Sequence, residues 1–212
     1  MLVVGLGNPG ARYAHTRHNA GWDVVERLVA RWKASPLETT VEYRAWRAID
    51  GGREVDLMVP LTFMNRSGEA VAVYRERRGL TPAELLVVVD DVYLPLGRLR
   101  FRPSGSSGGH NGLASIEATL GTREWSRLRI GVGAAASAAN LREHVLEAYA
   151  ADEVPVIESA LDRAAEAVEC WCREGIMPVM NRFNRSEEEV EESRPRSTKR
   201  RSSSSPGSTR TR

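Results

Sequence analysis

Hydrophobic positions along the chain follow two periods, one typical of β-strands and one typical of amphipathic helices. Apolar or alternating runs predict strands over residues 2–6, 43–49, 54–60, 85–90, 97–102 and 127–133. Helical spacing predicts helices over residues 19–33, 65–79, 109–120, 141–149 and 153–174. Gly51 and Gly52 indicate a hairpin between the second and third strands. Because hairpins are mixed with strand–helix alternation, we predict an α/β fold with a single-domain mixed β-sheet flanked by helices on both faces.

The end of the chain differs from the rest in composition. An acidic cluster between Glu187 and Glu192 precedes residues 193–212, which carry seven basic and no acidic side chains among many serines. Such a sequence holds too few apolar residues to form a core. We therefore expect a folded domain over residues 1–184 and an acidic-then-basic Ser/Arg-rich disordered tail over 185–212. The tail either contacts RNA nonspecifically or is a solvated extension without a role in activity.

Composition excludes several classes of protein. The chain of 212 residues is 42% hydrophobic but has no apolar run long enough to cross a bilayer, and its start does not resemble a secretory signal. Cys170 and Cys172 are two residues apart on a predicted helix, where they point in different directions, so neither a disulfide nor a zinc site is expected. We expect a cytoplasmic protein without a membrane partner.

The first turn satisfies a dinucleotide-binding pattern, because Gly5, Gly7 and Gly10 match G-x-G-x-x-G. That pattern requires a helix to begin within the turn. Here Pro9 removes an N–H donor, and the convincing helical period begins only near residue 20. No acidic residue ends a second strand at the required distance. A nucleotide site is therefore disfavoured.

Polar side chains follow several predicted strands and suggest acid–base chemistry at one edge of the sheet. His18 is the natural base, since imidazole exchanges protons near neutral pH, and Asp90, directly after an apolar strand, is the best candidate to orient it. Asn8, Asn65 and Asn111 suit an amide-rich substrate, although each asparagine alone is more often a turn or cap residue. A magnesium pair at Asp90 and the next residue lacks further carboxylate ligands and is disfavoured. No Gly-x-Ser-x-Gly nucleophile is present, so the sequence favours a histidine-activated water.

Alternating arginines suggest a nucleic-acid surface. Arg98, Arg100 and Arg102 project from one face of a predicted strand, and Arg127 and Arg129 could extend the patch. The glycine-rich loop over 104–109 then leads into a helix start, which predicts a phosphate cradle. A solvated strand face explains the same spacing about equally well.

Six segments of the chain resemble bacterial-type peptidyl-tRNA hydrolase, in matching order. They are Val4–Gly10, Thr16–Gly21, Pro60–Gly68, Gly108–Leu113, Arg127–Gly133 and Met180–Asn184. The resemblance covers residues 1–184. It implies a monomer that needs no cofactor or metal and that cleaves the ester between a peptide and the 3′ ribose of tRNA.

The resemblance also assigns roles residue by residue. It implies that His18 is the catalytic base, that Asp90 orients it and that Asn8 belongs to the same catalytic set. The substrate-binding residues implied by the resemblance are Tyr13, Phe63, Met64, Asn65 and Asn111. Arg129 corresponds to a family residue that binds the tRNA phosphate, and the alternating strand adds Arg100 and Arg102 as candidates for the same role. Tyr93, Ala114 and residues 134–139 depart from the family pattern. We expect these departures to affect tRNA affinity and the helix that forms a lid after residues 134–139 more than catalysis. A catalytically idle RNA-binding relative is the alternative.

Overall fold

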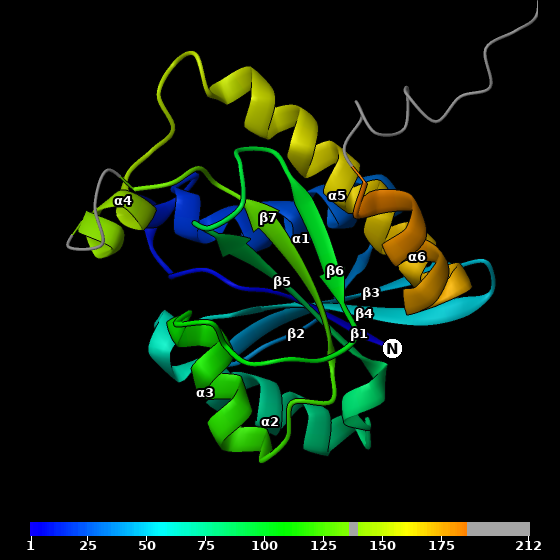
Figure 1. Ribbon diagram of the computed structural model, residues 1–212. Helices are drawn as coiled ribbons and strands as arrows, with labels where there is room; N and C mark the ends of the chain where they lie inside the picture. The colour runs from blue at the N-terminus through cyan, green and yellow to red at the C-terminus, as the bar shows by residue number, and fades with distance from the viewer. Residues whose placement is uncertain (136–139, 186–212) are drawn as a thin grey trace, which may run out of the picture.

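The computed structural model describes residues 1–135 and 140–185, in which strands form one seven-stranded mixed sheet with the order β2-β3-β4-β1-β5-β7-β6 (Figure 1). The strands are β1 (Leu2–Gly5), β2 (Ser35–Thr39), β3 (Tyr43–Asp50), β4 (Arg53–Pro60), β5 (Leu85–Asp91), β6 (Leu99–Arg102) and β7 (Ser126–Gly131). The prediction of a mixed sheet flanked by helices is confirmed.

The four central strands, β4, β1, β5 and β7, are parallel, while β2, β3 and β6 pair antiparallel at the two edges. The continuous apolar runs of β1 and β5 are buried along their whole length, as expected for strands covered on both faces. Because the central strands run in one direction, their carboxyl ends meet at one edge of the sheet.

Helices cover both faces of the sheet (Figure 1). The helices α1 (Ala20–Trp32), α5 (Val154–Glu174) and α6 (Ile176–Phe183) pack on one face around Val3, Leu28 and Leu161. The helices α2 (Ser67–Arg78) and α3 (Asn111–Leu120) pack on the other around Leu6 and Leu113. The short helix α4 (Leu141–Leu146) lies beyond the end of the sheet, and 3₁₀ turns occupy Ala11–Tyr13 (η1), Arg17–Asn19 (η2), Met64–Arg66 (η3) and Pro82–Glu84 (η4). None of these helices combines the length and apolar character that crossing a bilayer requires.

The structure differs from the predicted elements in a few places. Strand β2 and helix α6 were not predicted, since β2 is an exposed edge strand containing Pro36 and α6 contains Pro178 in its first turn. The helix predicted over 141–149 ends at Leu146. The hairpin at Gly51 and Gly52 is present, with positive φ at both residues. The tail predicted over 185–212 lies, beyond Arg185, outside the described residues.

A close contact between two glycines places α1 directly on the centre of the sheet. A Cβ atom on Gly5 would lie 2.2 Å from the carbonyl oxygen of Gly21, and one on Gly21 would lie 2.2 Å from that of Val88. The Trp22 N–H donates to the Leu6 carbonyl at 3.1 Å, which ties the first turn of α1 to the chain leaving β1. The residues just before α1, including His18, are thereby brought to the end of β5.

Candidate active site

A cavity of about 720 Å³ opens where the chain leaving β1, the end of β5 and the start of α3 come together. It is lined by all the predicted site residues except Arg100 and Arg102, namely Asn8, Tyr13, His18, Phe63, Met64, Asn65, Asp90, Asn111 and Arg129. Residues from five separate segments of the sequence therefore converge at the carboxyl end of the central strands. This is the place where open α/β sheets bind their ligands.

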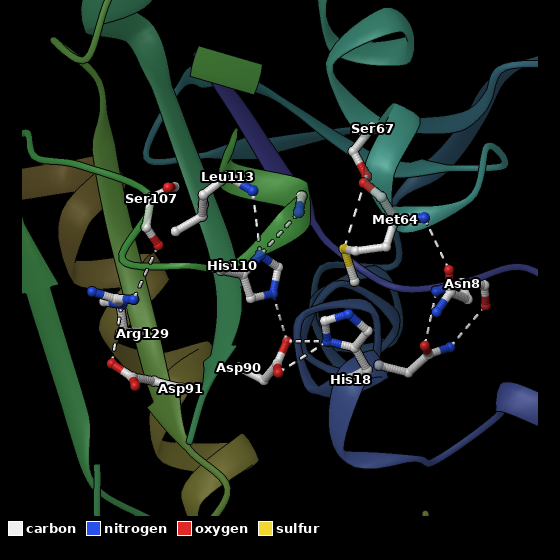
Figure 2. A network of polar contacts seen from close by, with 12 residues as sticks. Asn8, His18, Met64, Ser67, Asp90, Asp91, Ser107, His110, Leu113 and Arg129 are labelled. Carbon is white, nitrogen blue, oxygen red and sulfur yellow. Dashed lines mark hydrogen bonds and ion pairs between the residues drawn. The ribbon is translucent and has the colours of Figure 1, made fainter. Parts of the chain in front are cut away.

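His18 and Asp90 both line the cavity and are in direct contact with each other (Figure 2). The His18 Nδ1 atom lies 2.9 Å from Asp90 Oδ1 and 3.0 Å from Oδ2, and both residues are buried. Nδ1 therefore carries a proton toward the carboxylate, which leaves Nε2 as the nitrogen able to accept one. The predicted pairing is present.

The preceding residue, Arg17, holds the turn that carries His18. Its buried guanidinium donates to the Val132 carbonyl at 2.9 Å and forms an ion pair of 2.6 Å with Glu153, just before α5. The backbone N–H of Arg17 donates to the Glu147 carbonyl at 3.1 Å. His18 is thus attached to three separate parts of the chain through its neighbour.

Burial and charge act in opposite directions on this pair. Burial alone would lower the pKa of His18, but the charge of Asp90 and its hydrogen bond outweigh it and raise that pKa above the usual 6.5. Burial would raise the pKa of Asp90, but its electrostatic interactions and hydrogen bonds with the His18 and His110 rings hold that pKa well below its ordinary value. Asp90 is consequently ionised at neutral pH, and the His18 imidazolium is stabilised.

A second histidine, His110, shares the same carboxylate. Its Nε2 lies 3.0 Å from Asp90 Oδ1, and its Nδ1 accepts from the backbone N–H groups of Gly112 and Leu113 at 3.1 and 3.2 Å (Figure 2). Sequence analysis gave His110 no role, because the predicted helix over 109–120 placed it inside the helix, whereas α3 begins at Asn111 and His110 is its N-cap. The expected phosphate cradle at this helix start is wrong for these two N–H groups, since His110 already occupies them.

The His18, Asp90 and His110 side chains are also the one group of three potential metal ligands found in the described residues, with ligand atoms within 4.8 Å of one another. The two nitrogens contact the carboxylate at 2.9 and 3.0 Å, which are hydrogen-bond distances. A metal ion bound between them would have to displace both protons. The geometry favours a hydrogen-bonded network.

Asn8 joins the first turn to the segment after β4. Its Oδ1 accepts from the Met64 N–H at 2.9 Å, while its own backbone N–H and carbonyl bind the side chain of Asn19 at 2.9 and 3.0 Å. Met64 is buried beneath the cavity, and its neighbour Phe63 is 53% exposed at the rim. Asn65 and Asn111 line the cavity with exposed side chains.

The arginines of the predicted patch have three different environments. Arg129 borders the cavity and forms a 3.0 Å ion pair with Asp91. Arg100 lies opposite Arg129 in the β6–β7 pair and Arg102 lies opposite Arg127, and Arg100 and Arg102 are both exposed. Arg98, just before β6, donates to the Asn184 carbonyl at 2.8 Å.

Arg127 does not belong to this surface, contrary to the prediction. It is 1% exposed, its guanidinium stacks 3.7 Å from the Trp125 ring, and it donates to the carbonyls of Gly105, Arg123 and Trp125. Burial, together with the charge of Arg129, lowers its pKa to about 10. Arg127 holds the loop between β6 and α3 in place.

Helix α4 covers one side of the cavity. Leu141, Arg142, Val145 and Leu146 all line it. The segment after α4 is paired with the segment that carries the base, through the bridge between Thr16 and Ala148 and the bond from Arg17 to Glu147. The segment that follows α4 and the turn that carries His18 are therefore joined by backbone contacts.

Comparison with known proteins decides the family. The sequence model described as peptidyl-tRNA hydrolase matches residues 2–192. The chain is 49% identical over 187 residues to the peptidyl-tRNA hydrolase of Synechococcus sp. (strain JA-2-3B'a(2-13)), covering 87% of this chain and 83% of the relative. It is 40% identical to that of Shouchella clausii (strain KSM-K16), covering 86% and 99%. This chain belongs to the peptidyl-tRNA hydrolase family.

The fold supports the same conclusion. The crystal structure of peptidyl-tRNA hydrolase from Acinetobacter baumannii superposes with a TM-score of 0.82 at 34% identity, covering 86% of this chain and 93% of that one. Two departures from the family pattern have defined places here. Tyr93 is 74% exposed and lines the cavity, and Ala114, on α3, lines a second pocket together with Glu117 and Ala118.

Proposed function

We propose that this protein hydrolyses the ester bond between a peptide and the 3′ ribose of tRNA, and that a water activated by His18 is the nucleophile. Family membership supports the reaction, and the His18–Asp90 contact beside an open cavity carries the mechanism. Releasing the peptide from an aborted peptidyl-tRNA would return the tRNA to translation.

The proposed reaction needs only proton transfer and an orienting environment. Nε2 of His18 takes a proton from water, and the resulting hydroxide forms a bond to the ester carbonyl carbon. The imidazolium is stabilised by Asp90 during this step. When the tetrahedral intermediate collapses, the C–O bond to the ribose breaks and the 3′ oxygen takes the proton from His18, which restores the neutral base.

We further propose that the amide side chains around the cavity hold the peptide and the ribose end. Asn8 is fixed by its bonds to Met64 and Asn19, while Asn65 and Asn111 are exposed to the cavity and free to adapt to a substrate. Tyr13, Phe63 and Met64 add apolar contact area beside these amides. Such a mixture suits a peptide, which offers carbonyl and N–H groups as well as apolar side chains.

The tRNA body would lie along β6, β7 and the adjoining loop. Arg100 and Arg102 are exposed there, and Arg129 connects this surface to the cavity. Phosphate binding by arginine at this position would set the register of the tRNA while its 3′ end enters the cavity. We expect the protein to act as a cytoplasmic monomer without a cofactor, and light scattering of the purified protein tests the monomer.

The test is release of free tRNA from N-acetyl-aminoacyl-tRNA by the purified protein. His18→Ala should lower kcat at least about 100-fold, the usual scale for loss of a general base, with an unchanged fold by circular dichroism. His15→Asn is the matched control, because His15 lies three residues earlier with an exposed side chain and does not line the cavity. Binding of tRNA without release by the wild type would favour the idle RNA-binding relative.

A further inference from the structure

His110 connects the start of α3 to the catalytic carboxylate, and it touches each with a different ring nitrogen. Nδ1 accepts the N–H groups of Gly112 and Leu113, and Nε2 faces Asp90 Oδ1 at 3.0 Å (Figure 2). The ring is 8% exposed and lies with its centroid 5.0 Å from that of His18. Its position is therefore fixed on both sides.

These contacts fix the tautomer of His110. A nitrogen that accepts two backbone N–H groups carries no proton, so the single proton of the neutral ring is on Nε2 and is donated to Asp90. A proton added to Nδ1 would break both bonds to the helix start and place a positive charge at the positive end of the α3 dipole. His18 has the opposite arrangement, with its proton on Nδ1 and its Nε2 available for chemistry.

We infer that His110 is a positioning residue for the hydrolysis, held by the start of α3 as the Nε2–H tautomer so that it donates to Asp90 and fixes the carboxylate that orients His18. This inference rests on the proposed function and deepens it. Asp90 receives two donors, one from the ring that exchanges a proton in each turnover and one from a ring that keeps its own. The second donor takes part of the carboxylate's charge, so His18 binds its proton less tightly than it would beside a carboxylate of its own.

Several charged and titratable side chains lie near His110, and each of them has other surroundings. Arg129 of β7 is paired with Asp91 of β5, while Arg12 of η1, Tyr13 and Tyr93 border the cavity mouth. Arg142 of α4 lines the cavity. The pKa of Tyr149, which follows α4, is raised by burial and by the charge of Asp90. Among the described residues, none of these groups hydrogen bonds to the His110 ring.

Two substitutions separate the two contacts of His110. In His110→Asn the amide oxygen stands near the place of Nδ1 and can cap α3, but the side chain is too short to reach Asp90. In His110→Gln the amide N–H₂ reaches the place of Nε2 and can donate to Asp90, but the cap is lost. One variant keeps the helix start and the other keeps the donor.

Rate–pH profiles of both variants with N-acetyl-aminoacyl-tRNA test the inference. In His110→Asn we expect kcat to fall about tenfold or more with little change in KM, because a hydrogen bond to a charged group is lost. Its acid limb should move to higher pH, since His18 then faces the undivided charge of Asp90. His110→Gln should recover most of the lost kcat and restore the acid limb, while its urea midpoint falls below that of His110→Asn.

The inference is overturned if His110→Asn keeps the wild-type kcat and acid limb, since His110 would then be only a helix cap. It is overturned likewise if His110→Gln loses as much activity as His110→Asn, since a donor to Asp90 would then not restore the rate. A second measurement does not depend on activity. Ring ¹⁵N chemical shifts of the substrate-free wild type near pH 8 should show the Nε2–H tautomer for His110, and the Nδ1–H tautomer would overturn the inference. A wild type that releases no tRNA would contradict the proposed function while leaving this tautomer result intact.

Discussion

The proposed catalytic centre and the arginine surface of β6 and β7 use charge in opposite ways. In the centre, Asp90 is buried and its charge is met by two histidines at hydrogen-bond distance. On the surface, Arg100 and Arg102 are exposed at the edge of the sheet. The difference teaches that the buried carboxylate is held in one fixed geometry by its two partners, whereas the exposed arginines keep their charges accessible to an external anion.

Asp90→Asn removes the buried charge that the two histidines contact, and it should have the largest effect. We expect kcat to fall about 100-fold or more, because the His18 imidazolium loses its counter-charge. Without the carboxylate, burial acts unopposed on His18 and lowers its pKa, so the acid limb of the residual rate should move to lower pH. The measurement is a rate–pH profile.

Asp91→Asn is the matched control for this prediction, since Asp91 is the next residue of β5 and pairs with Arg129 rather than with His18. Its acid limb should stay where it is in the wild type. A common shift in both variants would mean that the limb reports general charge near β5 and not the carboxylate that touches His18.

Arg100→Ala combined with Arg102→Ala tests the exposed side. We expect KM to rise about tenfold at low salt with kcat unchanged, because phosphate contacts contribute to binding and not to the chemical step. The slope of log binding constant against log salt should become shallower by about one to two. Arg77→Ala, an exposed arginine of α2 outside both regions, is the control, and an equal loss with that variant would contradict a specific surface.

Arg127→Ala tests whether Arg127 lies outside the arginine surface, and it should change stability more than activity. The loop carbonyls that Arg127 binds would lose a buried donor, so we expect the free energy of unfolding to fall by about 2–3 kcal/mol. Urea denaturation measures this. A large change in the salt dependence of tRNA binding, with unchanged stability, would instead mean that Arg127 contacts the tRNA.

Much of the sheet could be predicted because buried strands carry continuous apolar runs. The strand ends lie within about two residues of the prediction, and the His18–Asp90 pair followed from a glycine turn and an acid directly after an apolar strand. Strand β2 gave no such signal, since none of its residues is fully buried and Leu37 is the one side chain of this strand that packs against the core. Local patterns identify what the core requires and miss what only the edges require.

The errors at the site have a common cause. Arg127 and Arg129 share a strand face and a residue type, yet Trp125 and the loop carbonyls bury one of them, and no spacing rule shows that. The role of His110 likewise depends on which ring nitrogen meets the helix start. Partners of long polar side chains are set by three-dimensional packing, which the order of residues alone does not reveal.

The pairing of residues 147 and 148 with the backbone at Thr16 and Arg17 has a consequence for turnover. A bulky product that displaces α4 on leaving would strain these bonds, and the strain would reach the imidazole one residue away. The rate of hydrolysis would then be highest while α4 covers the cavity and would fall as α4 moves away from it. Loss of the bond from the Arg17 N–H to the Glu147 carbonyl would therefore lower the rate of ester cleavage, although Glu147 does not line the cavity.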